Sequence, residues 1–445
     1  MKRLFYHIIL LALVGVSCTT TQNLQQLNLA HLYQEEGVVL KPKFRIYHES
    51  KDSSRVYFEG SSDQLLYIKQ DNSNEYKAEI GIKYRLYSNY NRDALIDSGS
   101  TRITDVKTNT DTKIIWGNFE LKYPKHTENE KYLLEVKLID LHRNLSYMDL
   151  ILVDRSDIQS NQQFLLTTPK GRVIFQNHYP LNVPFLLTHN SNPKQYIVRY
   201  YNRDFPVAST PYARNIESSF KYKSDSIFYV NASDTLTLTL PGFYHFQLNE
   251  STKNGFTVFS FYQEYPLITR RAKLGAPLRY ITTNDEFDAI MKEDEKQMKL
   301  EVDKFWLGLA GNVDRGKILV STYYNRVEAA NMYFTSYLEG WKTDRGIIYV
   351  ILGPPSEVNR NEYQEQWIYG DPTSSLTYVY TFTLISNPFC NNDYALNRSS
   401  SYKYGWAQAI ETWRKGRPFG IKEIKQAQDE RDRQVRVNSP PYFWY

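Results

Sequence analysis

The sequence predicts a multidomain protein with two tandem antiparallel β-sandwich domains followed by an α+β domain. Three observations lead to this prediction. Strand-like alternation of apolar and polar residues recurs between residues 38 and 265. Clusters of Asn, Asp, Ser and Thr separate these runs, as turns do in sandwiches. Beyond residue 268 helical periodicity appears beside short apolar runs, which is typical of helices packed on a small sheet.

The N-terminus is similar to a lipoprotein signal. Lys2 and Arg3 form a charged end, and Leu4 to Val16 is an apolar stretch too short for a stable membrane span. Cys18 follows Gly-Val-Ser, which resembles a lipoprotein cleavage box, although the common Leu three residues before the cysteine is missing. We predict that residues 1–17 are removed and that Cys18 carries the lipid. The alternative is an ordinary secretory signal with an unmodified cysteine.

The residues after Cys18 indicate which face of the membrane the protein occupies. Acidic residues directly after the lipidated cysteine often mark lipoproteins for the cell surface, but the first acidic residue here is Glu35. We therefore expect an outer-membrane lipoprotein on the periplasmic face. Residues 18–37 are predicted to be its tether, and the membrane is a predicted partner through Cys18.

Two stretches carry the sandwich pattern, residues 38–156 and residues 161–265. In the first, Tyr76 to Leu86 alternate apolar and polar side chains over eleven positions. In the second, Tyr196 to Tyr200 alternate in the same way, and Phe256 to Tyr262 reads as the last strand. The chain holds 37 Tyr, 22 Phe and 7 Trp. Because aromatic rings on strands suit sugar and peptide contacts, glycan is a possible partner.

The composition excludes several classes of function. The net charge of +5, less the two charges of Lys2 and Arg3, is too small to predict nucleic-acid binding. With Cys18 lipidated, Cys390 is the only remaining thiol, so neither an intramolecular disulfide nor a cysteine zinc site is expected. All eight histidines lie at or before His245, so the α+β domain cannot hold a histidine-based triad or metal site. We predict no metal and no cofactor.

Residues 268–420 are predicted to form the α+β domain. Thr283 and Glu286 have the spacing of a capping box that opens a helix. A second helix is expected from Asp314 to Glu339. The β-branched run from Ile347 to Leu352 and the alternating run from Thr377 to Leu384 predict strands. A further helix is expected from residue 404 to residue 415.

The most distinctive stretch of this domain is Gly340-Trp341-Lys342-Thr343-Asp344, followed by Arg345-Gly346. It resembles the motif of the GWxTD domain-containing proteins, and further family-like blocks extend the resemblance over roughly residues 274–370. The resemblance implies a bacterial envelope protein but implies no particular activity. It marks a candidate binding or structural motif composed of Gly340, Trp341, Thr343, Asp344, Arg345 and Gly346.

A helix-to-strand corner would explain each motif residue. Gly340 would occupy the helix C′ position, where φ is positive, and Trp341 would fold back onto the last helical turn. Asp344 would accept backbone N–H groups of the turn, and Arg345 would pair with a carboxylate such as Glu339. The alternative is that Trp341, Asp344 and Arg345 line a binding cleft.

The C-terminal residues 421–445 are predicted to be a basic helix with an aromatic tail. Residues 414–436 hold eight Lys or Arg and four Asp or Glu. The chain ends in Tyr442, Phe443, Trp444 and Tyr445. Because four exposed aromatic rings are unfavourable in water, we expect the tail to dock on its own fold or on a partner.

Together these features favour a non-enzymatic binding or scaffolding component of an envelope assembly, with envelope proteins as partners. No catalytic residue is predicted. A glycan-binding protein is one alternative. The other is a hydrolase acting on envelope glycan through two carboxylates, with Glu328, Glu339, Asp344 and Glu365 as candidates.

Overall fold

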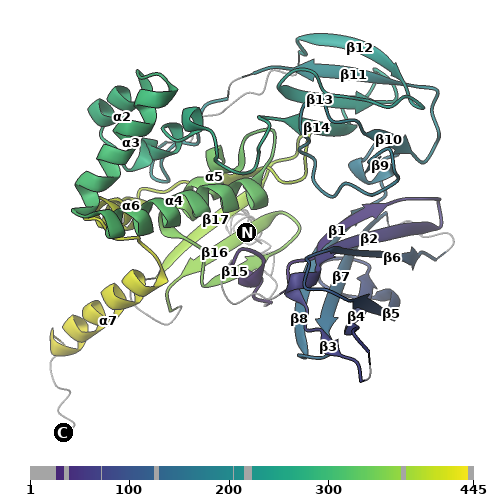
Figure 1. The fold of residues 1–445 in the computed structure, drawn as a ribbon, viewed down its shortest axis with the longest axis horizontal. Coiled ribbons are helices and arrows are strands. Elements are labelled where there is room, and N and C mark those ends of the chain that lie inside the picture. The colour runs from purple at the N-terminus through teal and green to yellow at the C-terminus, as the bar shows by residue number, and fades with distance from the viewer. Residues whose placement is uncertain are drawn as a thin grey trace, which may run out of the picture.

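The computed structural model describes residues 27–34, 40–71, 73–124, 130–203, 205–214, 223–371 and 377–438. The predicted lipid site Cys18 and the aromatic tail Tyr442–Tyr445 lie outside these residues. Two groups of strands occupy one side of the molecule, and the helices lie with a third sheet on the other side (Figure 1). This architecture confirms the predicted multidomain β plus α+β class.

The first group of strands forms two facing sheets. One sheet has the order β1-β2-β6, and the other has β3-β4-β7-β8 with β5 also paired to β4. Their bounds are β1 Lys43–Tyr47, β2 Ser53–Ser61, β3 Ile68–Lys69, β4 Tyr76–Tyr87, β5 Leu95–Lys107, β6 Ile114–Lys122, β7 Lys131–Asp140 and β8 Leu145–Asp154. Val56, Ile80, Ile82 and Leu134 lie among the buried side chains between the sheets. The alternation that predicted a strand from Tyr76 is therefore the inward and outward alternation of β4.

The second group pairs a two-stranded sheet, β10-β9, with a four-stranded sheet, β12-β11-β13-β14. The bounds are β9 Phe164–Thr167, β10 Leu186–His189, β11 Gln195–Tyr201, β12 Ser226–Asn231, β13 Gly242–Gln247 and β14 Phe256–Ser260. Phe164, Tyr196, Phe246 and Phe256 pack together in the core of this unit. The strands of both groups lie within the ranges predicted for the two sandwiches.

The α+β domain has a four-stranded antiparallel sheet in the order β15-β16-β17-β18. Its elements are α2 Asn284–Met291, α3 Glu295–Ala310, α4 Val313–Phe334, α5 Asp344–Leu352, β15 Glu357–Arg360, β16 Gln364–Tyr369, β17 Tyr378–Leu384, β18 Tyr394–Leu396, α6 Tyr402–Arg414 and α7 Ile421–Asn438. The predicted capping box at Thr283 and Glu286 is confirmed at the start of α2. The predicted strand at residues 377–384 is confirmed as β17.

The prediction of a strand from Ile347 to Leu352 is wrong, because these residues form most of α5. All nine residues of α5 are buried, so no polar face reveals a helical period. Thr343 begins the helix as its N-cap, since its hydroxyl accepts the backbone N–H of Gly346 at 3.0 Å. The preceding helix, α4, ends at Phe334 instead of Glu339.

The N-terminal segment 27–33 packs against the α+β domain, on residues that lie more than 300 positions later in the sequence. Leu29 donates its backbone N–H to the carbonyl of Val358 in β15 at 2.8 Å. Leu29, Ala30 and Tyr33 are buried there. The part of the predicted tether that the structure describes is therefore bound to the body of the protein. Among the described residues, no helix has the length and apolar character needed to cross a bilayer.

Candidate functional site

The GWxTD stretch forms a tight corner between α4 and α5. A short 3₁₀ turn, η6 (Gly340–Lys342), lies against α4. Gly340 does not have the positive φ that was predicted for it. Instead, a Cβ atom at this position would lie 1.9 Å from the carbonyl oxygen of Ala330 and 2.7 Å from the Cα of Asn331. Glycine is needed because the two backbones touch here.

Trp341 is bound to α4 through its backbone, and the residue is only 3% exposed. Its backbone N–H donates to the Asn331 side chain at 3.2 Å. Its indole N–H donates to Glu339 Oε2 at 2.9 Å, and Lys342 lies 3.2 Å from the other carboxylate oxygen of Glu339. Glu339 therefore binds Trp341 and Lys342, and the carboxylate that pairs with Arg345 is Glu365 instead of the suggested Glu339.

The second glycine of the motif, Gly346, also marks a backbone contact. A Cβ atom there would lie 2.0 Å from the carbonyl oxygen of Gly340. The first turn of α5 consequently lies directly on η6. Gly340, Thr343 and Gly346 together set the angle at which α5 leaves the corner.

Asp344 joins the corner to β18, which lies some fifty residues later in the sequence. Its Oδ2 accepts the backbone N–H of Leu396 at 2.8 Å, and both of its oxygens bind the guanidinium of Arg398. Asp344 was predicted to accept N–H groups of its own turn, but the backbone donor that it binds is in a distant strand, and Thr343 caps the turn instead. Burial raises the pKa of the Asp344 carboxyl, and Arg398 opposes this shift.

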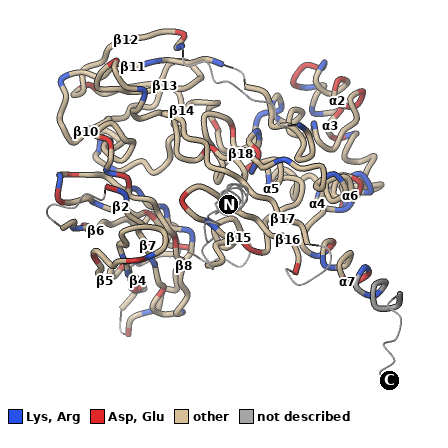
Figure 2. The backbone as a smooth tube through the Cα atoms, turned by 180° about the vertical axis from the view of Figure 1, so that it is seen from behind, with Lys and Arg blue, Asp and Glu red and all other residues tan. Residues whose placement is uncertain are grey.

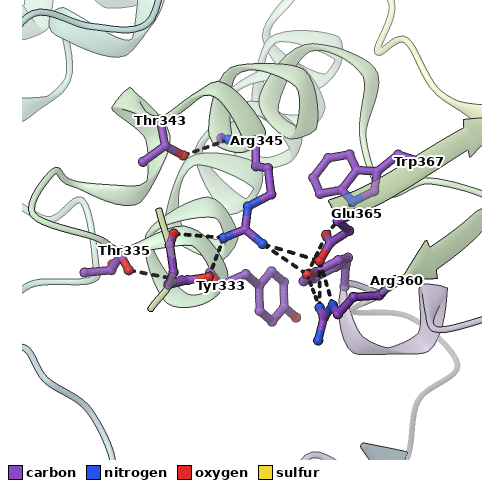
Figure 3. Close-up of polar contacts among 10 residues, drawn as sticks. Tyr333, Thr335, Thr343, Arg345, Arg360, Glu365 and Trp367 are labelled. Carbon is purple, nitrogen blue, oxygen red and sulfur yellow. Dashed lines mark hydrogen bonds and ion pairs between the residues drawn. The ribbon is translucent and has the colours of Figure 1, made fainter. Parts of the chain in front are cut away.

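Arg345 points into the domain interior, where it meets Glu365 (Figure 3). Arg345 Nη1 lies 3.5 Å from Glu365 Oε2, and Arg360 Nε donates to the same oxygen at 2.8 Å. The indole of Trp367 donates to Glu365 Oε1 at 2.6 Å. Burial would raise the pKa of Glu365, but the two guanidiniums together with the hydrogen bonds from Trp367 and Tyr33 outweigh it, and the net shift is downward.

Tyr33 completes this buried cluster from the N-terminal segment. Its hydroxyl donates to Glu365 Oε1 at 2.8 Å and accepts from Arg360 Nη2 at 2.7 Å. Its ring lies against Phe334 and Trp367. Sequence reasoning missed Tyr33, Arg360 and the role of Glu365 because no local pattern links residues more than 300 positions apart.

The four carboxylates proposed for hydrolysis each have their own partners. Glu328 accepts the backbone N–H of Ile268 at 2.7 Å. The other three, Glu339, Asp344 and Glu365, bind the groups described above. The motif residues are likewise buried, so the described side chains of the corner line no open cleft that would match the alternative prediction. Among the described residues, no group of three or more His, Cys, Asp or Glu side chains could hold a metal ion.

Comparison with known proteins places this corner in a defined family region. Residues 242–415 match the family model of the GWxTD domain, which also includes β13 and β14 of the second sandwich. No curated protein matches the chain.

Two solved structures show a distant likeness. One is a β-glucuronidase of Bacteroides uniformis, with 12% identity, a TM-score of 0.17, and coverage of 33% of this chain and 14% of that one. The other is B. uniformis β-glucuronidase 2 covalently bound to cyclophellitol-6-carboxylate aziridine, with 11% identity and the same TM-score and coverage. This chain spans about one seventh of the length of those enzymes, and a TM-score of this size does not indicate a shared fold.

Proposed function

We propose that this GWxTD domain-containing protein is a binding or scaffolding component of an envelope assembly, anchored at the periplasmic face of the outer membrane through Cys18. The GWxTD corner supports a structural role for the motif. Its two glycines touch backbone, and its Trp, Thr, Asp and Arg side chains each hold a different part of the domain together.

The observation that carries the binding role is the position of α7. This helix leaves the α+β domain and extends away from it (Figure 1). Ile424 and Gln428 attach its first half, since Ile424 is buried and Gln428 accepts the backbone N–H of Asp371 at 3.0 Å. Beyond Gln428 the described side chains, Asp429, Glu430, Arg431 and Arg433, are exposed.

The part of α7 beyond Gln428 spans only residues 429–438. An isolated helix of that length is only marginally stable in water, so this part gains stability by binding a partner. Figure 2 shows charges of both signs along the described part of α7. The described basic side chains of α7 are Lys422, Lys425, Arg431 and Arg433, and the acidic ones are Glu423, Asp429 and Glu430, so the excess is a single positive charge. We infer a protein partner with a groove that accepts this helix and carries charges complementary to both kinds of side chain.

Site-specific photocrosslinking in cells tests the proposal. A photoreactive amino acid replaces Gln426, which is exposed on α7, and a matched control replaces Lys317, whose side chain is 75% exposed on α4. We expect a discrete crosslinked protein from position 426 and none from position 317. The same products from both positions, or none from position 426, would contradict a docking role for α7.

The predicted anchor has its own test. Cys18→Ser should release the mature protein into the soluble periplasmic fraction, because stable attachment requires the lipid chains. Labelled fatty acid that still enters the variant would refute Cys18 as the lipid site. Digestion of the wild-type protein by protease added to intact cells would refute the periplasmic orientation.

Glycan binding is a second candidate, and Trp116 favours it. This side chain is 68% exposed on the outward side of β6, opposite Glu59 and diagonal to Tyr57 across the sheet. An exposed indole flanked by hydrogen-bonding groups suits the apolar face of a sugar ring. Titration with soluble peptidoglycan fragments should show binding that Trp116→Ala abolishes. Equal binding by both proteins would place any glycan site elsewhere.

A further inference from the structure

The face of the α+β domain that holds residues 27–33 has features of a recognition site. β15 is the edge strand of its sheet, and Asn28 and Leu29 lie against it, whereas Ala30–Leu32 form a 3₁₀ turn. Leu29 donates to the Val358 carbonyl at 2.8 Å, and the Asn28 side chain accepts from the Val358 N–H at 3.1 Å. The Asn28 amide also donates to the Ser356 carbonyl at 3.3 Å. Both backbone groups of Val358 are therefore bound, one by a backbone group and one by a side chain of the segment.

The other end of this face holds a particular chemical group. The Tyr33 hydroxyl donates to Glu365 Oε1, which also accepts from Trp367. The same hydroxyl accepts from Arg360 Nη2, which also lies 2.8 Å from Glu365 Oε2. Arg345 Nη1 approaches the Tyr33 hydroxyl at 3.5 Å. Phenylalanine would leave these buried charged groups without that partner. A site built in this way discriminates strongly for a phenol.

Burying the charged groups of this cluster costs desolvation free energy, so packing alone does not explain why they are there. Two arginines and one glutamate are removed from water here, with Arg345 2% and Glu365 0% exposed. Buried charges of this kind are often neutral or unfavourable for stability compared with apolar side chains, but they can impose specificity. Tyr349 also binds the segment, because its hydroxyl donates to the Tyr33 carbonyl at 2.7 Å.

We propose that this face is a peptide-binding site of the GWxTD domain, that residues 27–33 occupy it in cis, and that it can instead accept a partner segment in which Asn-Leu precedes a tyrosine. The segment also meets the first sandwich, where His31 Nε2 contacts the Met148 carbonyl at 2.6 Å, the His31 ring packs on Tyr147 and Leu32 lies against the core. Most of its described hydrogen bonds are to the α+β domain, so its exchange would leave the strand pairing of both domains intact. This inference deepens the proposed function, but the site is separate from α7.

The test uses the mature chain with Cys18→Ser and a specific protease site placed within residues 35–39. Cutting at that site leaves every domain present and turns the N-terminal segment into a separate peptide. A fluorescent peptide with the sequence of residues 27–34, Leu-Asn-Leu-Ala-His-Leu-Tyr-Gln, is then added, and its anisotropy is measured. We expect saturable binding to the cut protein. Binding to the uncut protein should be much weaker, because the cis segment competes at a high effective concentration.

Two peptide variants make the test specific. The peptide with Tyr33→Phe should bind at least about tenfold more weakly, since it lacks the hydroxyl that binds Glu365 and Arg360. The peptide with Gln34→Ala should bind like the original, because Gln34 is partly exposed and has no hydrogen bond among those described for the segment. Equal binding of the Tyr and Phe peptides would overturn the proposal. So would a cut protein that never exchanges its fragment, or one that unfolds on cutting. A failed crosslink at position 426 would leave this result unaffected.

Discussion

Gly340→Ala is the substitution that most directly probes the corner between α4 and α5. The added methyl group would lie 1.9 Å from the Ala330 carbonyl oxygen and 2.6 Å from its carbon. Both are backbone atoms of a helix, so no side-chain rotation can relieve the overlap. Overpacking typically costs about 1–3 kcal/mol, and a clash with fixed backbone belongs at the upper end, so we expect a loss of about 3 kcal/mol.

Urea unfolding followed by tryptophan fluorescence measures this loss. Five of the seven tryptophans are buried in the α+β domain, namely Trp306, Trp341, Trp367, Trp406 and Trp413. The signal therefore reports mainly on that domain. With a slope of about 1–3 kcal/mol per molar urea, the midpoint should fall by about 1 M or more.

Gly308→Ala is the matched control, because nothing lies within 4 Å of a Cβ atom at that helical position. It should raise stability by about 0.5–1 kcal/mol. Gly340→Asn separates the two explanations of the glycine. Asn tolerates a positive φ, so it would be accepted at a helix C′ position, whereas backbone contact excludes it. A midpoint unchanged by Gly340→Ala or Gly340→Asn would refute the backbone-contact argument.

Three further predictions concern ionisable groups. Burial raises the pKa of Asp393 to about 6, so the folded protein holds this proton more tightly than the unfolded chain. The free energy of unfolding should therefore fall, on the order of 2 kcal/mol, as the pH rises from about 4 to about 6. Asp393→Asn should remove this pH dependence in urea titrations, and an unchanged pH dependence would contradict the prediction. The pKa of Glu365 is lowered, so its contribution to folding stability is present at neutral pH and should be lost as the pH falls through its folded-state pKa. Glu365→Gln should weaken this loss of stability in acid. The same acid dependence in the variant and the wild type would rule the prediction out. Burial raises the pKa of the Cys390 thiol to about 12. In Cys18→Ser protein, where Cys390 is the only thiol, a thiol reagent should therefore react only after unfolding. Rapid reaction of the native protein would disprove the protection of Cys390.

Sequence patterns predicted the elements that depend on interactions between residues close together in the sequence. Strand β4 alternates because one of its faces is buried, and the capping box of α2 needs only Thr283 and Glu286. The error at α5 has a specific cause. Its run Ile347 to Leu352 is β-branched and buried on every side, so periodicity could not separate a helix from a strand. The Thr343 N-cap followed by Asp344 was the available signal for a helix.

The candidate site could be predicted only in part. The motif residues were identified from their resemblance to a family, and their burial at a corner agrees with the structural alternative. Their partners were not predictable, because Asp344 binds Arg398 and Arg345 binds Glu365 through the tertiary fold. Tyr33 comes from a segment that the sequence indicated only as a tether.

The central claim is that the motif supports a binding protein and performs no chemistry, and a double-mutant cycle on Asp344 and Arg398 tests it most directly. Asp344→Asn alone leaves a buried guanidinium without its counter-charge and should cost about 3 kcal/mol. Arg398→Gln in the same chain removes that charge and should recover much of the loss. Crosslinking from position 426, measured per folded molecule, should then equal that of the wild type. A double variant that melts like the wild type but captures no partner would contradict the account, because it would assign Asp344 a direct role in function.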